Sequence, residues 1–103
     1  MHQLIQQHQA EIADVCRRYR VQQLDVFGSA ARGQDFDPQR SDVDFLVEFK
    51  PGPNTGYARM YFEFQEALEQ LVGRPVELVN VTAIRNPYFR AAVQKSRERV
   101  YGS

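Results

Sequence analysis

Hydrophobic and polar residues follow two different periods along this chain. Where apolar residues recur every three to four positions, they share one side of a helix. This spacing predicts helices over residues 3–19, 57–72 and 88–99. Shorter apolar segments that end at turn-forming residues indicate strands. The predicted strands span residues 21–27, 42–49 and 75–79, and a brief helical turn is expected at 29–32.

The order of these elements predicts an α/β fold of the α+β kind, in one domain spanning residues 1–103. We expect a sheet of about three strands. The strands at 42–49 and 75–79 should lie side by side or nearly so, because a strand–helix–strand crossover joins them with a right-handed connection. The helices should pack mainly on one face of the sheet, which leaves the other face partly open for a functional site.

Composition narrows the class of protein. The chain has 103 residues, of which 43% are hydrophobic and 25% charged, values typical of soluble globular domains. No apolar segment approaches the roughly 20 residues of a membrane span, and the first residues lack the basic start of a signal peptide. The single cysteine, Cys16, cannot form an internal disulfide and is expected in the core. The sequence therefore predicts a cytoplasmic protein that does not act in a membrane.

Charge is balanced overall but unevenly distributed. Thirteen basic and thirteen acidic residues cancel, which argues against strong nucleic-acid binding. Residues 35–48 contain five acids and one base, whereas residues 85–99 contain five bases and one acid. An acidic segment can hold metal ions, and a basic one can meet phosphates or an acidic partner. In an arbitrary domain, charged segments of this kind are more often solvated surfaces.

Two short motifs carry candidate chemistry. Asp42 and Asp44 project from the same face of a strand, because alternate strand residues share a face, and two such carboxylates suit Mg²⁺. Gly28 lets the backbone approach a ligand, and Ser29 opens a helical turn that favours a phosphate. Either motif alone is more often a capped turn or a solvated strand edge. Together they are the equipment for moving a phosphoryl or nucleotidyl group.

A third carboxylate lies on the next predicted strand. Glu77 is flanked by apolar residues, where a charge is costly to bury without a partner, and a metal ion would be such a partner. Arg32 follows the Gly-Ser turn closely enough to reach a triphosphate, although an exposed arginine at the end of a short helix would look the same.

The DNA polymerase beta-like nucleotidyltransferase superfamily has a signature that is similar to residues 27–33 (FGSAARG) followed by residues 41–47 (SDVDFLV). The small size and the C-terminal sequence further resemble the minimal nucleotidyltransferases, which are often the MNT antitoxin of HEPN–MNT toxin–antitoxin pairs. That part of the resemblance rests on GRPVELV at 73–79, Asn86-Pro87-Tyr88, Arg90 and Val100-Tyr101-Gly102. The similarity covers nearly the whole chain.

The resemblance implies roles for individual residues. Gly28 and Ser29 would hold the phosphates of the nucleotide together with Arg32, and Asp42 and Asp44 would bind two Mg²⁺ ions. The third acid of the family completes one metal site and helps to deprotonate the attacking hydroxyl. That role falls on Glu77, where the family usually has Asp.

The implied function is an antitoxin that transfers AMP from ATP to a tyrosine of a HEPN toxin, in a hetero-oligomer with that toxin. An alternative is an antitoxin that blocks the toxin by contact alone. Residues 85–99 are the candidate docking surface for a partner, although a solvated helix face would have the same pattern. Transfer to a small molecule would normally require an additional acceptor-binding domain, for which 103 residues leave little room.

Overall fold

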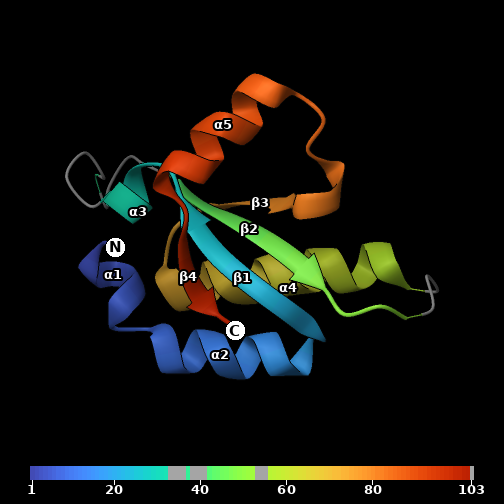
Figure 1. Cartoon of the computed structure of the whole chain (residues 1–103). Helices are drawn as coiled ribbons and strands as arrows, with labels where there is room; N and C mark the ends of the chain where they lie inside the picture. The colour runs from blue at the N-terminus through green and yellow to red at the C-terminus, as the bar shows by residue number, and fades with distance from the viewer. Residues whose placement is uncertain (33–36, 38–41, 53–55, 103) are drawn as a thin grey trace.

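The computed structural model describes residues 1–32, 37, 42–52 and 56–102. Five α-helices, one 3₁₀-helix and four strands occur in this part of the chain (Figure 1). In chain order they are α1 (Gln3–Gln6), α2 (Gln9–Arg18), β1 (Val21–Phe27), α3 (Ser29–Arg32), β2 (Val43–Phe49), α4 (Tyr57–Val72), β3 (Val76–Asn80), η1 (Val81–Ala83), α5 (Pro87–Ser96) and β4 (Glu98–Tyr101).

The strands form one mixed sheet in the order β3-β2-β1-β4. β1 is antiparallel to both β2 and β4, whereas β2 and β3 run parallel and are joined through α4. The predicted α/β fold and the neighbouring placement of β2 and β3 are therefore confirmed. The sheet has four strands rather than about three.

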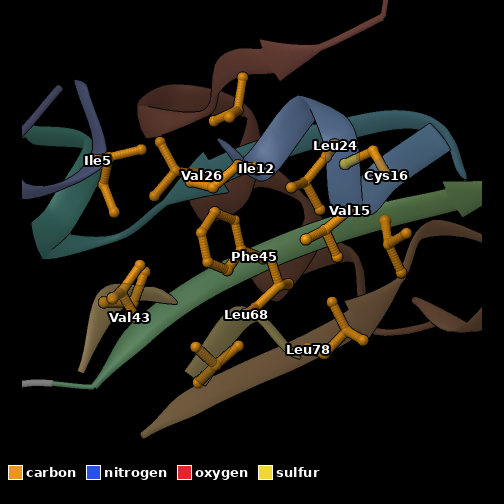
Figure 2. Close-up of a cluster of buried hydrophobic side chains, with 14 of the residues drawn as sticks. Ile5, Ile12, Val15, Cys16, Leu24, Val26, Val43, Phe45, Leu68 and Leu78 are labelled. Atoms are coloured by element: carbon orange, nitrogen blue, oxygen red, sulfur yellow. The ribbon is translucent and has the colours of Figure 1, made fainter. Parts of the chain in front are cut away.

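The two faces of the sheet are covered differently. Side chains alternate along β2, so that Val43, Phe45 and Val47 enter the main hydrophobic core with residues of α1, α2 and α4. Figure 2 shows this core, with Phe45 lying among side chains from several elements. On the opposite face Leu46 joins a smaller cluster with Phe27 and residues of α5 and its preceding loop. The helices thus lie mainly on one face, as expected, with α5 across the other face (Figure 1).

The predicted first helix is divided in two. α1 ends after Gln6, and α2 begins at Gln9. His8 leaves helical geometry, with φ −107° and ψ 9°, and its Nδ1 lies 2.9 Å from the carbonyl oxygen of Leu4. Ile5 and Ile12 are nevertheless both fully buried. The apolar period continues across the break, which explains why the pattern alone predicts one helix.

The helix predicted at the C-terminal end of the chain is also partly wrong. The helix expected over 88–99 ends at Ser96, and Glu98–Tyr101 forms the edge strand β4 against β1. Four residues are too few for a period to be recognised. The pairing instead depends on contacts with β1, which lies more than 70 residues earlier in the chain. In the described part of the chain, none of the helices is long and apolar enough to cross a membrane.

Candidate active site

The predicted site residues gather where β1 ends and where β2 and β3 begin. Phe27, Asp44 and Glu77 occupy neighbouring positions across β1, β2 and β3, because Asp44 pairs with Phe27 on one side and with Glu77 on the other. Asp44 is half-buried, whereas Glu77 is exposed. Asp42 is exposed and lies immediately before β2. Side chains directly opposite in paired strands share a face, so Asp44 and Glu77 lie together on the face that α5 partly covers.

Gly28 joins this group from the end of β1. Its φ of +71° lies in the left-handed region, and a Cβ built on it would stand 2.7 Å from Oδ2 of Asp44. A side chain at this position would therefore force the flexible end of Asp44 to move. The Gly28 carbonyl accepts hydrogen bonds from the backbone N–H groups of Ala31 and Arg32, both at 3.1 Å, and so closes the short helix α3. Glycine is favoured here by the left-handed φ, and it leaves the Asp44 carboxylate undisturbed.

Burial and the neighbouring carboxylates act on Asp44. The pKa of Asp44 is raised to about 6, mainly because the side chain is half-buried. The charge of Glu77, the hydrogen bond between Glu77 and Asp44, and the charge of Asp42 raise it further. The nearby guanidinium of Arg32 acts in the opposite direction. The structure therefore brings Asp42, Glu77 and Arg32 within electrostatic range of Asp44. An acidic group held in such surroundings favours a cation.

This donor set fits magnesium that binds together with a phosphate ligand. Among the described residues, no three His, Cys, Asp or Glu side chains form a group that could hold a metal ion by themselves. Mg²⁺, however, is usually bound by one or two carboxylates plus substrate phosphates and water. The neighbouring Asp44 and Glu77 are hard oxygen donors, and the excess negative charge around them is what such an ion would neutralise.

Ser29 opens α3 directly after Gly28 and is half-buried. Its neighbour Ala30 is anchored from the chain start, since the backbone N–H of His2 donates to the Ala30 carbonyl at 2.7 Å. The buried Cys16 lies in the main core, as expected, and burial raises the pKa of its thiol to about 12. Cys16 is thus a core residue rather than a nucleophile.

Sequence reasoning missed residues that surround the Gly-Ser turn. Ser96 accepts a hydrogen bond from the Gly28 N–H, and Asp25 forms ion pairs with Arg97 and Arg99. Asp25 is 3% exposed and is the buried charged residue of the described chain. A signal for Asp25 exists in the sequence, because it interrupts an apolar strand where an unpaired charge would be costly. No local signal identifies its two partners.

A model of the family described as nucleotidyltransferase domain matches residues 11–100. "Putative protein adenylyltransferase MJ0128" of Methanocaldococcus jannaschii is 35% identical over 94 residues, covering 84% of this chain and 91% of that protein. Protein adenylyltransferase MntA of Thermococcus cleftensis is 33% identical over 94 residues, covering 91% of this chain and 84% of that protein.

Solved structures show the same fold. A minimal nucleotidyltransferase structure superposes with a TM-score of 0.74 at 27% identity, covering 95% of both chains. A toxin–antitoxin structure with AMP-PNP has a TM-score of 0.69 at 18% identity, covering 92% of this chain and 73% of the other. A complex of a tri-AMPylated Shewanella oneidensis HEPN toxin with its MNT antitoxin has a TM-score of 0.65 at 17% identity, covering 96% and 73%.

Proposed function

Because the chain belongs to the nucleotidyltransferase domain family and is a protein adenylyltransferase of the MntA type, we propose that it transfers AMP from ATP to a tyrosine of a HEPN toxin. The modification would neutralise the toxin, so that the chain acts as its antitoxin in a hetero-oligomer. The observation that carries the proposal is that Asp44 lies next to Glu77 on the neighbouring strand and against Gly28 at the end of β1. The related complex with an AMPylated HEPN toxin supports the choice of acceptor.

In the proposed adenylyl transfer, each residue of the candidate site would have its own role. The tyrosine oxygen forms a bond to the α-phosphorus, the bond to the β-phosphate oxygen breaks, and pyrophosphate leaves. Glu77 would accept the proton of the hydroxyl, while Ser29 and Arg32 would hold the leaving phosphates. Asp42, Asp44 and Glu77 would hold two Mg²⁺ ions, which when bound neutralise the charge of the triphosphate.

The test is transfer of label from α-labelled ATP to a HEPN toxin in the presence of Mg²⁺. We expect label on the toxin with the wild type and a loss of at least about hundredfold in the Asp42→Ala, Asp44→Ala double variant. Glu48→Ala is the matched control, because Glu48 is a half-buried acid on the same strand and face as Asp44, four residues further along β2. Undiminished transfer by the double variant would contradict the proposed site.

A second function is favoured by one observation. Glu77 stands where the family usually has Asp, and its side chain hydrogen bonds to Asp44. A longer acid alters the position of the carboxylate, and misplacement of about 1 Å can reduce a rate hundredfold. The alternative is an antitoxin that neutralises a HEPN toxin by direct binding. It predicts that the double Asp variant still suppresses toxicity although no label is transferred.

A further inference from the structure

The backbone N–H of Gly28 is bound by a residue from the far end of the chain. β1 leaves the sheet at Phe27, so the next N–H group has no ladder partner in β2 or β4. Ser96 supplies one, since its Oγ accepts the Gly28 N–H at 3.0 Å across 68 positions of sequence. This contact connects the end of α5 to the turn that carries Ser29.

Ser96 is itself held in place by the residue that follows it. The Arg97 backbone N–H donates to the Val93 carbonyl at 2.9 Å and closes the last turn of α5. The Arg97 Nε lies 2.6 Å from Oδ2 of the buried Asp25. Arg99 Nε takes the other carboxylate oxygen, at 2.5 Å. Both oxygens of Asp25 are thus bound, which ties the α5–β4 junction to the middle of β1.

On its other side Gly28 lies against Asp44. A Cβ on Gly28 would stand 2.7 Å from the Asp44 carboxylate. The Gly28 backbone therefore lies between Ser96 and Asp44, a predicted metal ligand. A glycine in a turn is conformationally free unless something holds it. Here the hydrogen bond from its N–H to Ser96 orients the Phe27–Gly28 peptide plane, from which the turn to Ser29 begins.

We propose that Ser96 is a positioning residue of the nucleotide site, held by the Asp25–Arg97 ion pair and acting through the Gly28 N–H. The inference rests on the proposed function, because it needs a nucleotide at Ser29 and Asp44. Ser96 does not touch the nucleotide; it holds the turn ready for the phosphates. Removal of its hydroxyl leaves the turn to be ordered at the moment of binding, which weakens affinity.

The experiment measures the dissociation constant of a non-hydrolysable ATP analogue with Mg²⁺ by calorimetry on the full chain. For Ser96→Ala we expect a rise of about fivefold, the equivalent of one net hydrogen bond. Ser96→Thr, which keeps the hydroxyl, should bind within twofold of the wild type. In the transfer assay Ser96→Ala should raise the KM for ATP and leave kcat nearly unchanged.

Two arginine variants form a matched pair. Arg97 and Arg99 both contact Asp25, but only Arg97 adjoins Ser96. We expect Arg97→Lys to weaken nucleotide binding in the same direction as Ser96→Ala, and Arg99→Lys to leave it unchanged. Melting temperatures measured beside each titration separate a positioning role from simple unfolding. Equal effects of the two arginine variants on affinity would overturn the coupling through Ser96.

The outcomes separate this inference from the proposed function. If the wild type binds the analogue and labels the toxin while Ser96→Ala binds with unchanged or higher affinity, the positioning role is wrong and the proposed function stands. A higher affinity would mean that Ser96 competes with the phosphates for the Gly28 N–H. If the wild type binds no nucleotide, both proposals fail together.

Discussion

Two aspartates on neighbouring strands of one sheet face have opposite surroundings. Asp25 of β1 lies opposite Leu46, which is two residues after Asp44 on β2, so both acids project to the side of α5. Asp25 is bound by two arginines, one at each carboxylate oxygen. Asp44 instead faces Glu77 and Asp42, with Arg32 as the cation that acts on it.

This difference separates a structural charge from a functional one. The charge of Asp25 is neutralised within the fold, and the result is attachment of β4 and the end of α5 to the sheet. Burial, and then the negative charge of Glu77 and Asp42, raise the pKa of Asp44 to about 6, and among the described residues Arg32 offsets this only in part. A ligand with compensating charge would remove that cost, as expected where a site is built for a cation.

The largest effect is expected from removing the buried charge. Asp25→Asn leaves Arg97 and Arg99 facing a neutral amide. Because both arginines are partly exposed to solvent, the change should cost about 2 kcal/mol of unfolding free energy, less than the loss of a partner in a fully buried pair. Asp14→Asn is the matched control, because Asp14 also pairs with an arginine but on the exposed surface, where the loss should be below about 1 kcal/mol. Urea titration of both variants is the measurement. Similar losses would show that Asp25 is no more important than a surface pair.

An intermediate effect is expected at the glycine that contacts Asp44. Gly28→Ala and Gly73→Ala both place a side chain at a left-handed φ, +71° and +69°, at a cost of about 1 kcal/mol each. Only at Gly28 does the new Cβ meet another group, the Asp44 carboxylate, whose flexible end can rotate away.

The two glycine variants should therefore be similarly destabilised yet differ in nucleotide binding. We expect affinity to fall at least about tenfold in Gly28→Ala, because Asp44 is displaced, and to be unchanged in Gly73→Ala. Thermal melts and calorimetry on the same samples test this. Equal affinities for the two variants would mean that the contact between Gly28 and Asp44 is not part of the nucleotide site.

The smallest effect concerns stability and pH. Since the folded-state pKa of Asp44 is raised above the ordinary value of 3.8 to about 6, its ionisation destabilises the metal-free fold as pH rises between these values. Asp44→Asn cannot ionise, so in EDTA it should melt above the wild type at pH 7.5, by only about 1–4 °C because solvent screens a half-buried group. The difference should shrink at pH 4. A variant that melts below the wild type at pH 7.5 would contradict the electrostatic account of Asp44.

Much of the fold follows from local pattern. The helix predicted over 57–72 coincides with α4, because its apolar side and the left-handed Gly73 at its end are both local features. The segments of β1, β2 and β3 are recovered to within one residue, since alternation in β2 and β3 marks which side chains enter the core. The grouping of Gly28, Asp42, Asp44 and Glu77 also follows, because neighbouring strands bring their ends together.

The sequence by itself thus determined the main helical segments, three of the four strands and the residues that carry the candidate chemistry. Periodicity and turn residues act over a few positions and identify the face on which a residue lies. Only the tertiary structure decided that the chain after Ser96 becomes a fourth strand, that Asp25 is paired by Arg97 and Arg99, and that Ser96 binds the Gly28 N–H. These partners lie about 70 positions apart, and no local preference specifies which distant group will satisfy a buried charge or an unpaired N–H.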